Sequence, residues 1–256
     1  ASFVSDLQKK LYAHYVVQAV SIADGDLAPV LEMARQKKIA VYLGIMERAA
    51  DRGGHSVYAC MVYVDQDGDI RSAHRKLMPT YEERLVWAMG DGNGLRTHPL
   101  GPFTVGGLNC WENWLPLPRA ALYAEGEDLH VAIWPGNQRN TEDITRYIAR
   151  EGRSFVVSVS GLMRKRDIPD GVPEVELLRD KADDVMANGG SCVASPNGEW
   201  ILEPEIGVES LRIAELDHRV VLEERQSLDV VGHYSRPDVT RLVVNRQRQS
   251  TAEFVD

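Results

Sequence analysis

Residues 106–119 of the chain are Gly-Gly-Leu-Asn-Cys-Trp-Glu-Asn-Trp-Leu-Pro-Leu-Pro-Arg. Cys110 follows a short apolar segment, residues 103–105, which predicts a buried strand, and Pro116 and the alanine-rich run 119–124 after it predict a helix. Cys110 is therefore expected at a strand-to-helix turn, where the positive end of a helix stabilises a thiolate and lowers its pKa. We interpret Cys110 as a nucleophile. A buried structural cysteine is the alternative, since cysteine is among the most buried residues.

The length and composition are those of an ordinary globular protein. The chain has 256 residues, of which 44% are hydrophobic and 26% charged, so one large domain is expected. The net charge is -9, and no run of lysine or arginine interrupts this acidic balance. These features argue against nucleic acid or an anionic membrane as the main partner and leave small molecules or other proteins.

The cysteines indicate the compartment. Cys60, Cys110 and Cys192 are an odd number at wide spacing, which fits neither a disulfide framework nor a zinc motif, so we expect no metal and a reducing environment. No stretch approaches the ~20 apolar residues of a membrane span, and the N-terminus has no signal-peptide pattern. A cytoplasmic protein is expected. Cys60 and Cys192 lie in apolar runs and are interpreted as packing residues.

Apolar runs of strand length alternate with helical patterns, which predicts an α/β fold. The expected strands are residues 39–46, 56–64, 69–74, 103–105, 129–134, 154–160, 191–194, 200–202 and 211–216. The expected helices are residues 5–20, 27–38, 119–124, 141–151 and 218–225, with Asp26 and Asp217 as N-caps of the second and the last. The turn at residues 65–68 joins two of the strands into a hairpin.

Three segments lack such patterns. Residues 76–94 predict a long loop with one helical turn near residues 82–87, and loops of this length are usually functional. Residues 164–190 are charged and rich in proline and glycine, which indicates an excursion over the surface. The tail, residues 226–256, shows no helical period. We expect it to lie across another surface, such as that of a second subunit.

Several motifs together resemble those of the nitrilases, a branch of the carbon-nitrogen hydrolase superfamily. Residues 106–119 match the nucleophile signature of that family at every position, and residues 74–84, His-Arg-Lys-Leu-Met-Pro-Thr-Tyr-Glu-Glu-Arg, resemble its lysine loop. Further matches are residues 90–94, 195–200 and 232–237, in family order. The resemblance implies an α-β-β-α sandwich without a cofactor. It also implies hydrolysis of a nitrile to a carboxylic acid and ammonia, and association into dimers or spirals.

The resemblance also implies roles for charged residues. The Cys110 thiolate would attack the nitrile carbon, and Lys76 would donate to the negative charge that develops on nitrogen. Glu83 matches the second glutamate of the family, which helps to position the substrate and the lysine. The residues alone do not separate Glu83 from Glu82, which the family register leaves as a plain surface charge. For Lys76 and Glu83 the alternative is an ordinary solvated side chain.

Two tryptophans are candidates for the walls of a substrate pocket. Trp111 follows the nucleophile and Trp134 ends the next strand, so both are expected at the same sheet edge. The backbone N–H of Trp111 should reach the developing anion. Packing in the core is an equal alternative for Trp134. His130, near the start of its strand, is interpreted as a core histidine with its hydrogen bonds satisfied.

The sequence departs from the family in one place. The family's general base is a glutamate after a proline at the end of an early strand, whereas Pro173-Glu174 and Pro204-Glu205 come far too late. Glu47 ends an early strand, but in family register it matches a glutamate whose role is structural. We therefore expect residues 1–225 to be a carbon-nitrogen hydrolase domain without its first two strands and one helix, followed by the tail.

Two other functions remain open. An amidase or cyanide-degrading hydrolase of the same superfamily uses the same nucleophile and lysine, although Trp111 after the cysteine favours the nitrilase branch. A non-catalytic assembly protein that keeps the fold is the alternative from another class, because no general-base glutamate is found in the expected place.

Overall fold

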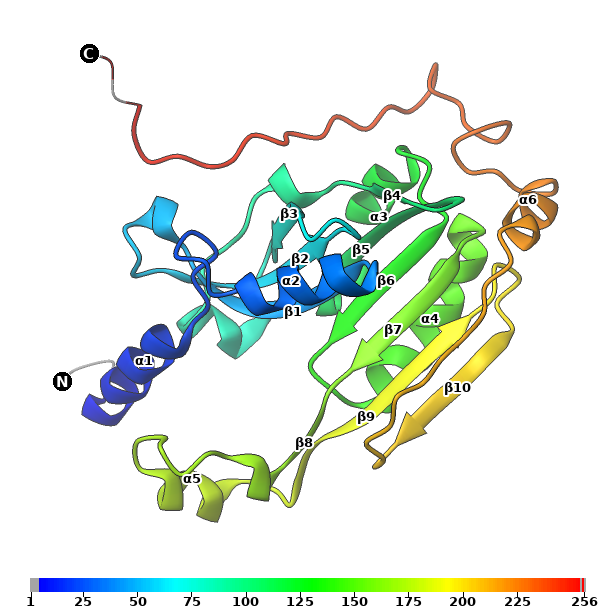
Figure 1. The fold of residues 1–256 in the computed structure, drawn as a ribbon. Coiled ribbons are helices and arrows are strands. Elements are labelled where there is room, and N and C mark those ends of the chain that lie inside the picture. Colours follow the sequence, from blue (N-terminus) through cyan, green and yellow to red (C-terminus); the bar gives the residue numbers. More distant parts are fainter. Residues whose placement is uncertain (1–4, 254, 256) are drawn as a thin grey trace. The chain divides into compact units, whose positions relative to one another are not determined.

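The computed structural model describes residues 5–253 and 255 and shows two compact units, each containing helices and strands (Figure 1). Unit 1 consists of the described parts of residues 1–94, 165–184 and 246–256, and unit 2 of residues 95–164 and 185–245. The α/β class that the alternating pattern predicted is confirmed. None of the helices in the described residues has the length and apolar character needed to span a bilayer.

The sheet of unit 1 is an antiparallel meander. Its strands are β1 (Val41–Arg48), β2 (Val57–Val64) and β3 (Ile70–Arg75), in that order. The predicted hairpin joins β2 to β3, and its turn is closed by Asp65, whose Oδ1 accepts hydrogen bonds from the backbone of Asp67 at 2.9 Å and Asp69 at 3.0 Å. This use of an aspartate side chain to satisfy turn N–H groups explains why the turn was visible in the sequence.

Helices complete unit 1. They are α1 (Asp6–Gln18), α2 (Ala28–Lys37) and α5 (Val175–Lys181), with short 3-10 helices η1 (Ala50–Arg52), η2 (Tyr81–Leu85), η3 (Gly92–Gly94) and η5 (Lys165–Asp167). Leu31 and Ala34 of α2 pack in one apolar cluster with Cys60 and Val62 of β2, so the packing role of Cys60 is confirmed. The predicted cap of α2 is wrong. Asp26 accepts from the backbone N–H of Ser21 at 2.7 Å, and the helix starts without a side-chain cap.

The sheet of unit 2 is mixed. Its strands are β4 (His98–Leu100), β5 (Phe103–Asn109), β6 (Leu129–Trp134), β7 (Phe155–Ser160), β8 (Leu162–Arg164), β9 (Val185–Ala194) and β10 (Trp200–Ile206). Their order is β10-β9-β7-β6-β5-β4, and β8 pairs with β9. Strands β5, β6 and β7 are parallel, and Asn109 pairs with Ile133. The residues that follow β5 and those that end β6 therefore lie at the same edge of the sheet.

Helices of unit 2 are α3 (Pro116–Tyr123), α4 (Gln138–Gly152) and α6 (Arg219–Arg225), with the 3-10 helix η4 (Cys110–Trp114). Helix α4 covers one face of β6, β7, β9 and β10 (Figure 1). Its residues Ile144 and Ile148 are fully buried in a cluster that includes Val156 and Ala194. Helix α3 begins at Pro116, earlier than predicted, because proline is well accepted in the first turn of a helix.

Several predicted elements differ from the structure. Residues 211–216 are extended but form no strand, and Leu211 and Ile213 are 90% and 77% exposed. A strand needs a neighbouring strand to pair with, and among the described residues no strand pairs with this segment. The surface excursion ends early, because Gly189 and Gly190 belong to β9 and take positive φ values beside its register shifts with β10. Helix α6 starts at Arg219 and its N-cap residue is His218, which makes no side-chain cap hydrogen bond, so the predicted cap Asp217 is wrong. Asp217 still accepts from the backbone N–H of Arg219 at 3.0 Å.

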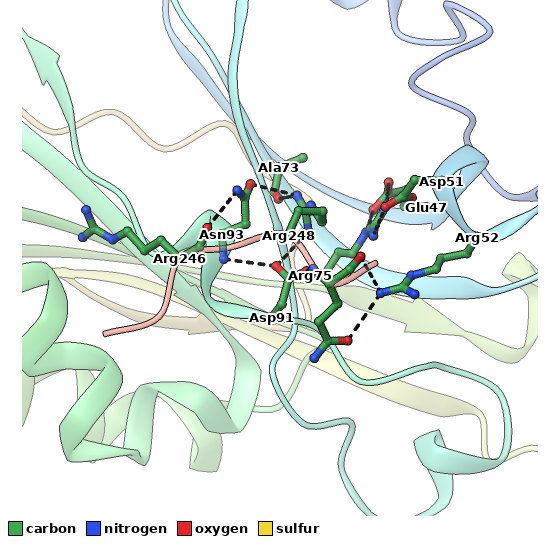
Figure 2. Close-up of polar contacts among 10 residues, drawn as sticks. Glu47, Asp51, Arg52, Ala73, Arg75, Asp91, Asn93, Arg246 and Arg248 are labelled. Carbon is green, nitrogen blue, oxygen red and sulfur yellow. Dashed lines mark hydrogen bonds and ion pairs between the residues drawn. The ribbon is translucent and has the colours of Figure 1, made fainter. Parts of the chain in front are cut away.

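The described part of the tail has no helix. Its end contacts unit 1 of the same chain through a network of hydrogen bonds, in which Asp91 accepts from Nη1 of Arg248 at 3.0 Å and from the backbone N–H of Gln249 at 2.9 Å (Figure 2). Asn93 donates to the carbonyl of Arg246 at 3.1 Å. Residues 246–249 are thus fixed to the loop that follows β3.

Candidate active site

Cys110 takes the strand-end position that the sequence predicted. It directly follows β5, starts η4 and has a φ of +58°, in the left-handed region. A residue with a Cβ pays about 1–2 kcal/mol for this conformation, so the surrounding structure must hold it there. The helix that begins at Cys110 is the short 3-10 helix η4, which ends at Trp114. The α-helix α3 begins only at Pro116.

Two buried side chains of the same motif hold this turn. Glu112 accepts from the backbone N–H of Asn109 at 3.0 Å, and Nδ2 of Asn113 donates to the carbonyls of Cys110 at 2.8 Å and Leu108 at 3.2 Å. Sequence reasoning used Glu112 and Asn113 to recognise the motif but assigned them no role. The signal was present, because a glutamate three residues after an asparagine matches a capping box.

His130 links this turn to a third buried side chain. Its Nε2 lies 2.8 Å from Oδ1 of Asn113 and its Nδ1 lies 3.0 Å from Oε1 of Glu127, and all three side chains are fully buried. The interpretation of His130 as a core histidine with satisfied hydrogen bonds is confirmed. Its connection to Cys110 through Asn113 was not predicted, because His130 and Asn113 are 17 residues apart in sequence and meet only in the fold.

The two tryptophans differ in burial. Trp134 is 3% exposed and packs in the same apolar cluster as Cys110, together with Ala132 and Ile144. Its indole Nε1 has no hydrogen-bond partner among the described residues. Trp111 is 49% exposed. Core packing, the alternative for Trp134, is therefore observed, whereas the roles of both side chains toward a substrate stay predictions.

Lys76 and Glu83 lie together in unit 1. Lys76 follows β3 and is 1% exposed, and its Nζ donates to Oε2 of Glu83 at 2.5 Å and to Oγ1 of Thr80 at 3.2 Å. The backbone N–H of Thr80 donates to the same Glu83 oxygen at 2.6 Å. The alternative of a solvated lysine does not hold. Glu82 is exposed, so the structure separates the two glutamates as the family register did.

Glu47 is a member of a buried ion cluster. Its two oxygens accept from Nε and Nη2 of Arg75 at 2.8 and 2.7 Å, and Asp51 accepts from the same guanidinium (Figure 2). Hydrogen bonds from Arg75 lower the pKa of Asp51 despite its partial burial. The guanidinium also lies 4.5 Å from the centre of the Tyr58 ring. These contacts agree with the structural role expected for Glu47.

The other two thiols are shielded. Burial, with the Glu47 charge as a second cause, raises the pKa of Cys60 well above its ordinary value. Burial also raises the pKa of Cys192, although side-chain hydrogen bonds with Thr145, Thr141 and Ser158 oppose that rise. A thiol with a raised pKa is a poor nucleophile, so neither cysteine competes with Cys110 for that role.

A second ion cluster supports the end of η4. Buried Arg119 donates to the carbonyl of Asn113 at 2.7 Å and to Oε2 of Glu151 at 2.7 Å, and the hydroxyl of Tyr123 donates to the same carboxylate at 2.9 Å. Burial alone would raise the pKa of Glu151, but the hydrogen bonds from Arg119 and Tyr123 lower it below its ordinary value. Burial and the Glu151 charge raise the pKa of Tyr123.

The structure thus brings the predicted residues together in two groups. Lys76 and Glu83 form a hydrogen-bonded pair in unit 1, and Cys110, Trp111 and Trp134 lie in unit 2. Across the described part of the chain, no group of three or more histidine, cysteine, aspartate or glutamate side chains is arranged to hold a metal ion.

The strained Cys110 after a parallel strand is a candidate thiol nucleophile, and the buried Lys76–Glu83 pair is a candidate hydrogen-bond donor group. Residues 7–225 match the model of the carbon-nitrogen hydrolase family, and the chain belongs to this family. The protein is therefore a hydrolase. Its similarity to nitrilases, inferred from the sequence motifs, is confirmed by the relatives below.

One relative is an aliphatic nitrilase of Sinorhizobium fredii (strain HH103), 33% identical over 239 residues that span 93% of this chain and 75% of the relative. A carbon-nitrogen hydrolase from Helicobacter pylori G27 has a similar structure, with a TM-score of 0.65 and 19% identity over 86% of this chain and 78% of the other. A mutant of the amidase from Nesterenkonia sp. AN1, which carries a Michael adduct of acrylamide at its active-site cysteine, gives a TM-score of 0.59. It is 16% identical over 85% of this chain and 79% of its own. These structures confirm the expected α-β-β-α sandwich class.

Proposed function

We propose that the protein hydrolyses a nitrile to a carboxylic acid and ammonia, with Cys110 as the nucleophile and Lys76 and Glu83 as its catalytic partners. The strained conformation of Cys110, fixed by Glu112 and Asn113, is the observation that carries this proposal. Two relatives support it. The Sinorhizobium protein is named an aliphatic nitrilase, and the Nesterenkonia amidase has an active-site cysteine that forms a covalent adduct.

The chemistry follows from the side chains. The Cys110 thiolate adds to the nitrile carbon and forms a thioimidate, while negative charge on nitrogen is met by an N–H of Lys76 and the backbone N–H of Trp111. Water then adds to the thioimidate, ammonia leaves, and a second water releases the acid from the thioester. Burial of Lys76 and its bonds to Glu83 and Thr80 support a fixed donor rather than a mobile surface charge.

The surroundings of the reaction are part of the proposal. Trp111 and Trp134 would form the walls beside the nitrile substituent, and no nucleic acid, membrane or cofactor takes part. The protein would act as a homo-oligomer, a dimer or a spiral, with the domain at residues 1–225 and the tail at 226–256 contacting another subunit. None of the three cysteines is in a disulfide, which supports a reducing compartment such as the cytoplasm.

The proposal is tested by measuring ammonia and the intact mass of the protein after incubation with an aromatic nitrile, an aliphatic nitrile, cyanide and an amide. We expect a nitrile to modify Cys110 fastest. Cys110→Ala should abolish both ammonia release and the adduct with little loss of stability, because alanine fits the turn. Cys192→Ala, which removes a buried thiol from another strand, should retain both.

Each alternative has its own outcome. Faster reaction with the amide or with cyanide would identify an amidase or a cyanide-degrading hydrolase. A folded protein that forms no adduct with any of the four compounds would be a non-catalytic assembly protein. Substantial ammonia release by Cys110→Ala would remove this residue from the nucleophile role.

A further inference from the structure

A chain of buried hydrogen bonds leads from Glu127 to the backbone of Cys110. Oε1 of Glu127 lies 3.0 Å from Nδ1 of His130, and Nε2 of His130 lies 2.8 Å from Oδ1 of Asn113. Asn113 in turn donates to the carbonyl of Cys110 at 2.8 Å. Every side chain between Glu127 and Cys110 is fully shielded from solvent, so a change at Glu127 acts on Cys110 only through these bonds or through packing.

The hydrogen-bond partners determine which ring nitrogen of His130 carries a proton toward Asn113. Nδ2 of Asn113 faces two carbonyl oxygens, those of Leu108 and Cys110, which fixes the orientation of the amide. Oδ1 of Asn113 therefore faces His130, and because an amide oxygen only accepts, Nε2 of His130 must carry a proton. The contact between Nδ1 and Oε1 of Glu127 holds a second proton, which belongs either to Nδ1 or to the Glu127 carboxyl group. Asn113 thus fixes the proton on Nε2 of His130, and Glu127 binds the other ring nitrogen.

The site of Glu127 is built into the sheet. Gly106 of β5 pairs in register with His130, and a Cβ on Gly106 would lie 2.2 Å from Oε1 of Glu127. Oε2 of Glu127 has no hydrogen-bond partner among the described residues. A buried polar atom without a partner destabilises the folded state, and an apolar side chain of similar size would avoid this loss. Stability alone does not account for a carboxyl group at this place.

The arginine side chains near Glu127 form their hydrogen bonds with other groups. Arg225 donates to the backbone carbonyl of Glu127 at 2.6 Å, and Arg119 is occupied by Glu151 and by the carbonyl of Asn113. Neither guanidinium is bonded to the Glu127 carboxyl group. His130 is therefore the hydrogen-bond partner through which that carboxyl acts.

We propose that Glu127 and His130 are positioning residues that, through Asn113, hold Cys110 in its strained left-handed conformation and aim its thiol at the substrate. This inference rests on the proposed role of Cys110. The amide of Asn113 that donates to the Cys110 carbonyl is itself fixed by its contacts with Leu108 and His130, so it can hold Cys110 in this unfavourable conformation. If Asn113 turns away, Cys110 relaxes and its sulfur leaves the attacking position.

The test uses two variants and a matched control. Glu127→Gln keeps the shape and offers an amide N–H to Nδ1 of His130, so it retains the tautomer. Glu127→Leu removes the partner of Nδ1 at similar volume. Asn113→Asp keeps an acceptor for His130 but replaces the donor to the Cys110 carbonyl with an oxygen. For each protein, the rate of alkylation of Cys110 by iodoacetamide and the rate of adduct formation with a nitrile are measured together with thermal unfolding.

We expect Glu127→Leu and Asn113→Asp to slow both reactions at least tenfold, since small displacements of a reacting group have effects of about this size or larger. The loss should be in the maximal rate, with the half-saturating nitrile concentration within about twofold of that of the unmodified protein. Glu127→Gln should react at nearly the original rate. Nitrogen NMR should show a protonated Nε2 on His130 in the unmodified protein and in Glu127→Gln.

The opposite results are equally clear. Folded Glu127→Leu and Asn113→Asp proteins that react at the original rate, or an unprotonated Nε2 in the unmodified protein, would overturn the proposal. If Glu127→Leu does not fold, Asn113→Asp and the NMR measurement decide. If the proposed function is wrong, the protein will not react with nitriles. Alkylation of Cys110 and NMR of His130 can still be measured in that case, so they test the positioning roles separately from the proposed function.

Discussion

At the residue scale, the two reactive groups are both placed by buried neighbours. Cys110 keeps a positive φ because Asn113 binds its carbonyl, and Lys76 points inward because Glu83 and Thr80 accept hydrogen bonds from its ammonium group. A buried ammonium group is tolerated only when it is paired and hydrogen-bonded. The pairing that makes Lys76 stable inside the protein is therefore the same pairing that would present it to a substrate.

Lys76→Ala should slow adduct formation by a nitrile about 100-fold, because one lost donor to a developing anion typically has that effect. Glu83→Gln should also slow it, since it removes the charge that Lys76 binds. Glu82→Gln is the matched control, because Glu82 is exposed on the same 3-10 helix, and it should change the rate by less than twofold. Adduct formation is followed by intact mass. Equal effects of the two glutamate substitutions would contradict the assignment.

Much of the candidate site was predictable because its residues lie close together in sequence. Cys110 and Trp111 share one motif, and Lys76 and Glu83 lie on one loop. What the sequence did not reveal were partners joined only by the fold, such as Glu127 and His130, which reach Asn113 because β5 and β6 are parallel neighbours. Nothing in the sequence near Asn113 indicates which residues of the neighbouring strand will contact it.

At the element scale, prediction succeeded where local chemistry and packing agree. The β2–β3 hairpin has an aspartate that closes its turn, and α4 has an apolar stripe that meets the sheet. It failed for residues 211–216. Their alternating pattern is typical of a strand, but among the described residues no strand pairs with them. It also failed at Gly189, because glycine pairs indicate turns in sequence but here allow a bulge inside β9.

Helices α3 and α4 are joined by the Arg119–Glu151 ion pair, and this contact predicts a loss of stability. Glu151→Gln should lower the free energy of unfolding by about 2–3 kcal/mol, because it leaves the buried Arg119 without its charged partner. Asp238→Asn breaks an ion pair in which both side chains are exposed and should leave the free energy of unfolding nearly unchanged. Urea unfolding at neutral pH compares them.

The same pair predicts a dependence on pH. The pKa of Glu151 in the folded protein is lowered from its ordinary value of 4.5, so the folded state favours the charged form. Its contribution to stability is therefore present above that ordinary value and is lost as the pH falls through the lower pKa of the folded state. The difference between the original protein and Glu151→Gln should shrink at acidic pH. A difference that stays constant down to pH values at which both proteins unfold would contradict this explanation.

At the scale of the whole molecule, the tail predicts association. Residues 226–245 include several exposed apolar side chains, among them Val239 and Val243. Exposed apolar side chains that lie together indicate a surface that contacts another protein. Light scattering at micromolar concentration should show a dimer or a larger assembly. Replacing both valines with serine should shift the protein toward monomers, whereas Val17→Ser, which changes an exposed valine of α1, should not. A monomer with the tail intact would contradict the prediction.

The last prediction concerns a preparation of these 256 residues. Attack by Cys110 needs only a thiolate and a donor, but release of the acid needs a group that accepts a proton from water near neutral pH. Glu47 is bound through both oxygens to Arg75, and Glu83 accepts from Lys76 and Thr80, so these two carboxylates are engaged. We therefore expect a stable adduct on Cys110 and no more than about one ammonia per chain. Many turnovers by a folded preparation of verified mass would contradict this expectation and would make Glu47 and Glu83 the first candidates for the base.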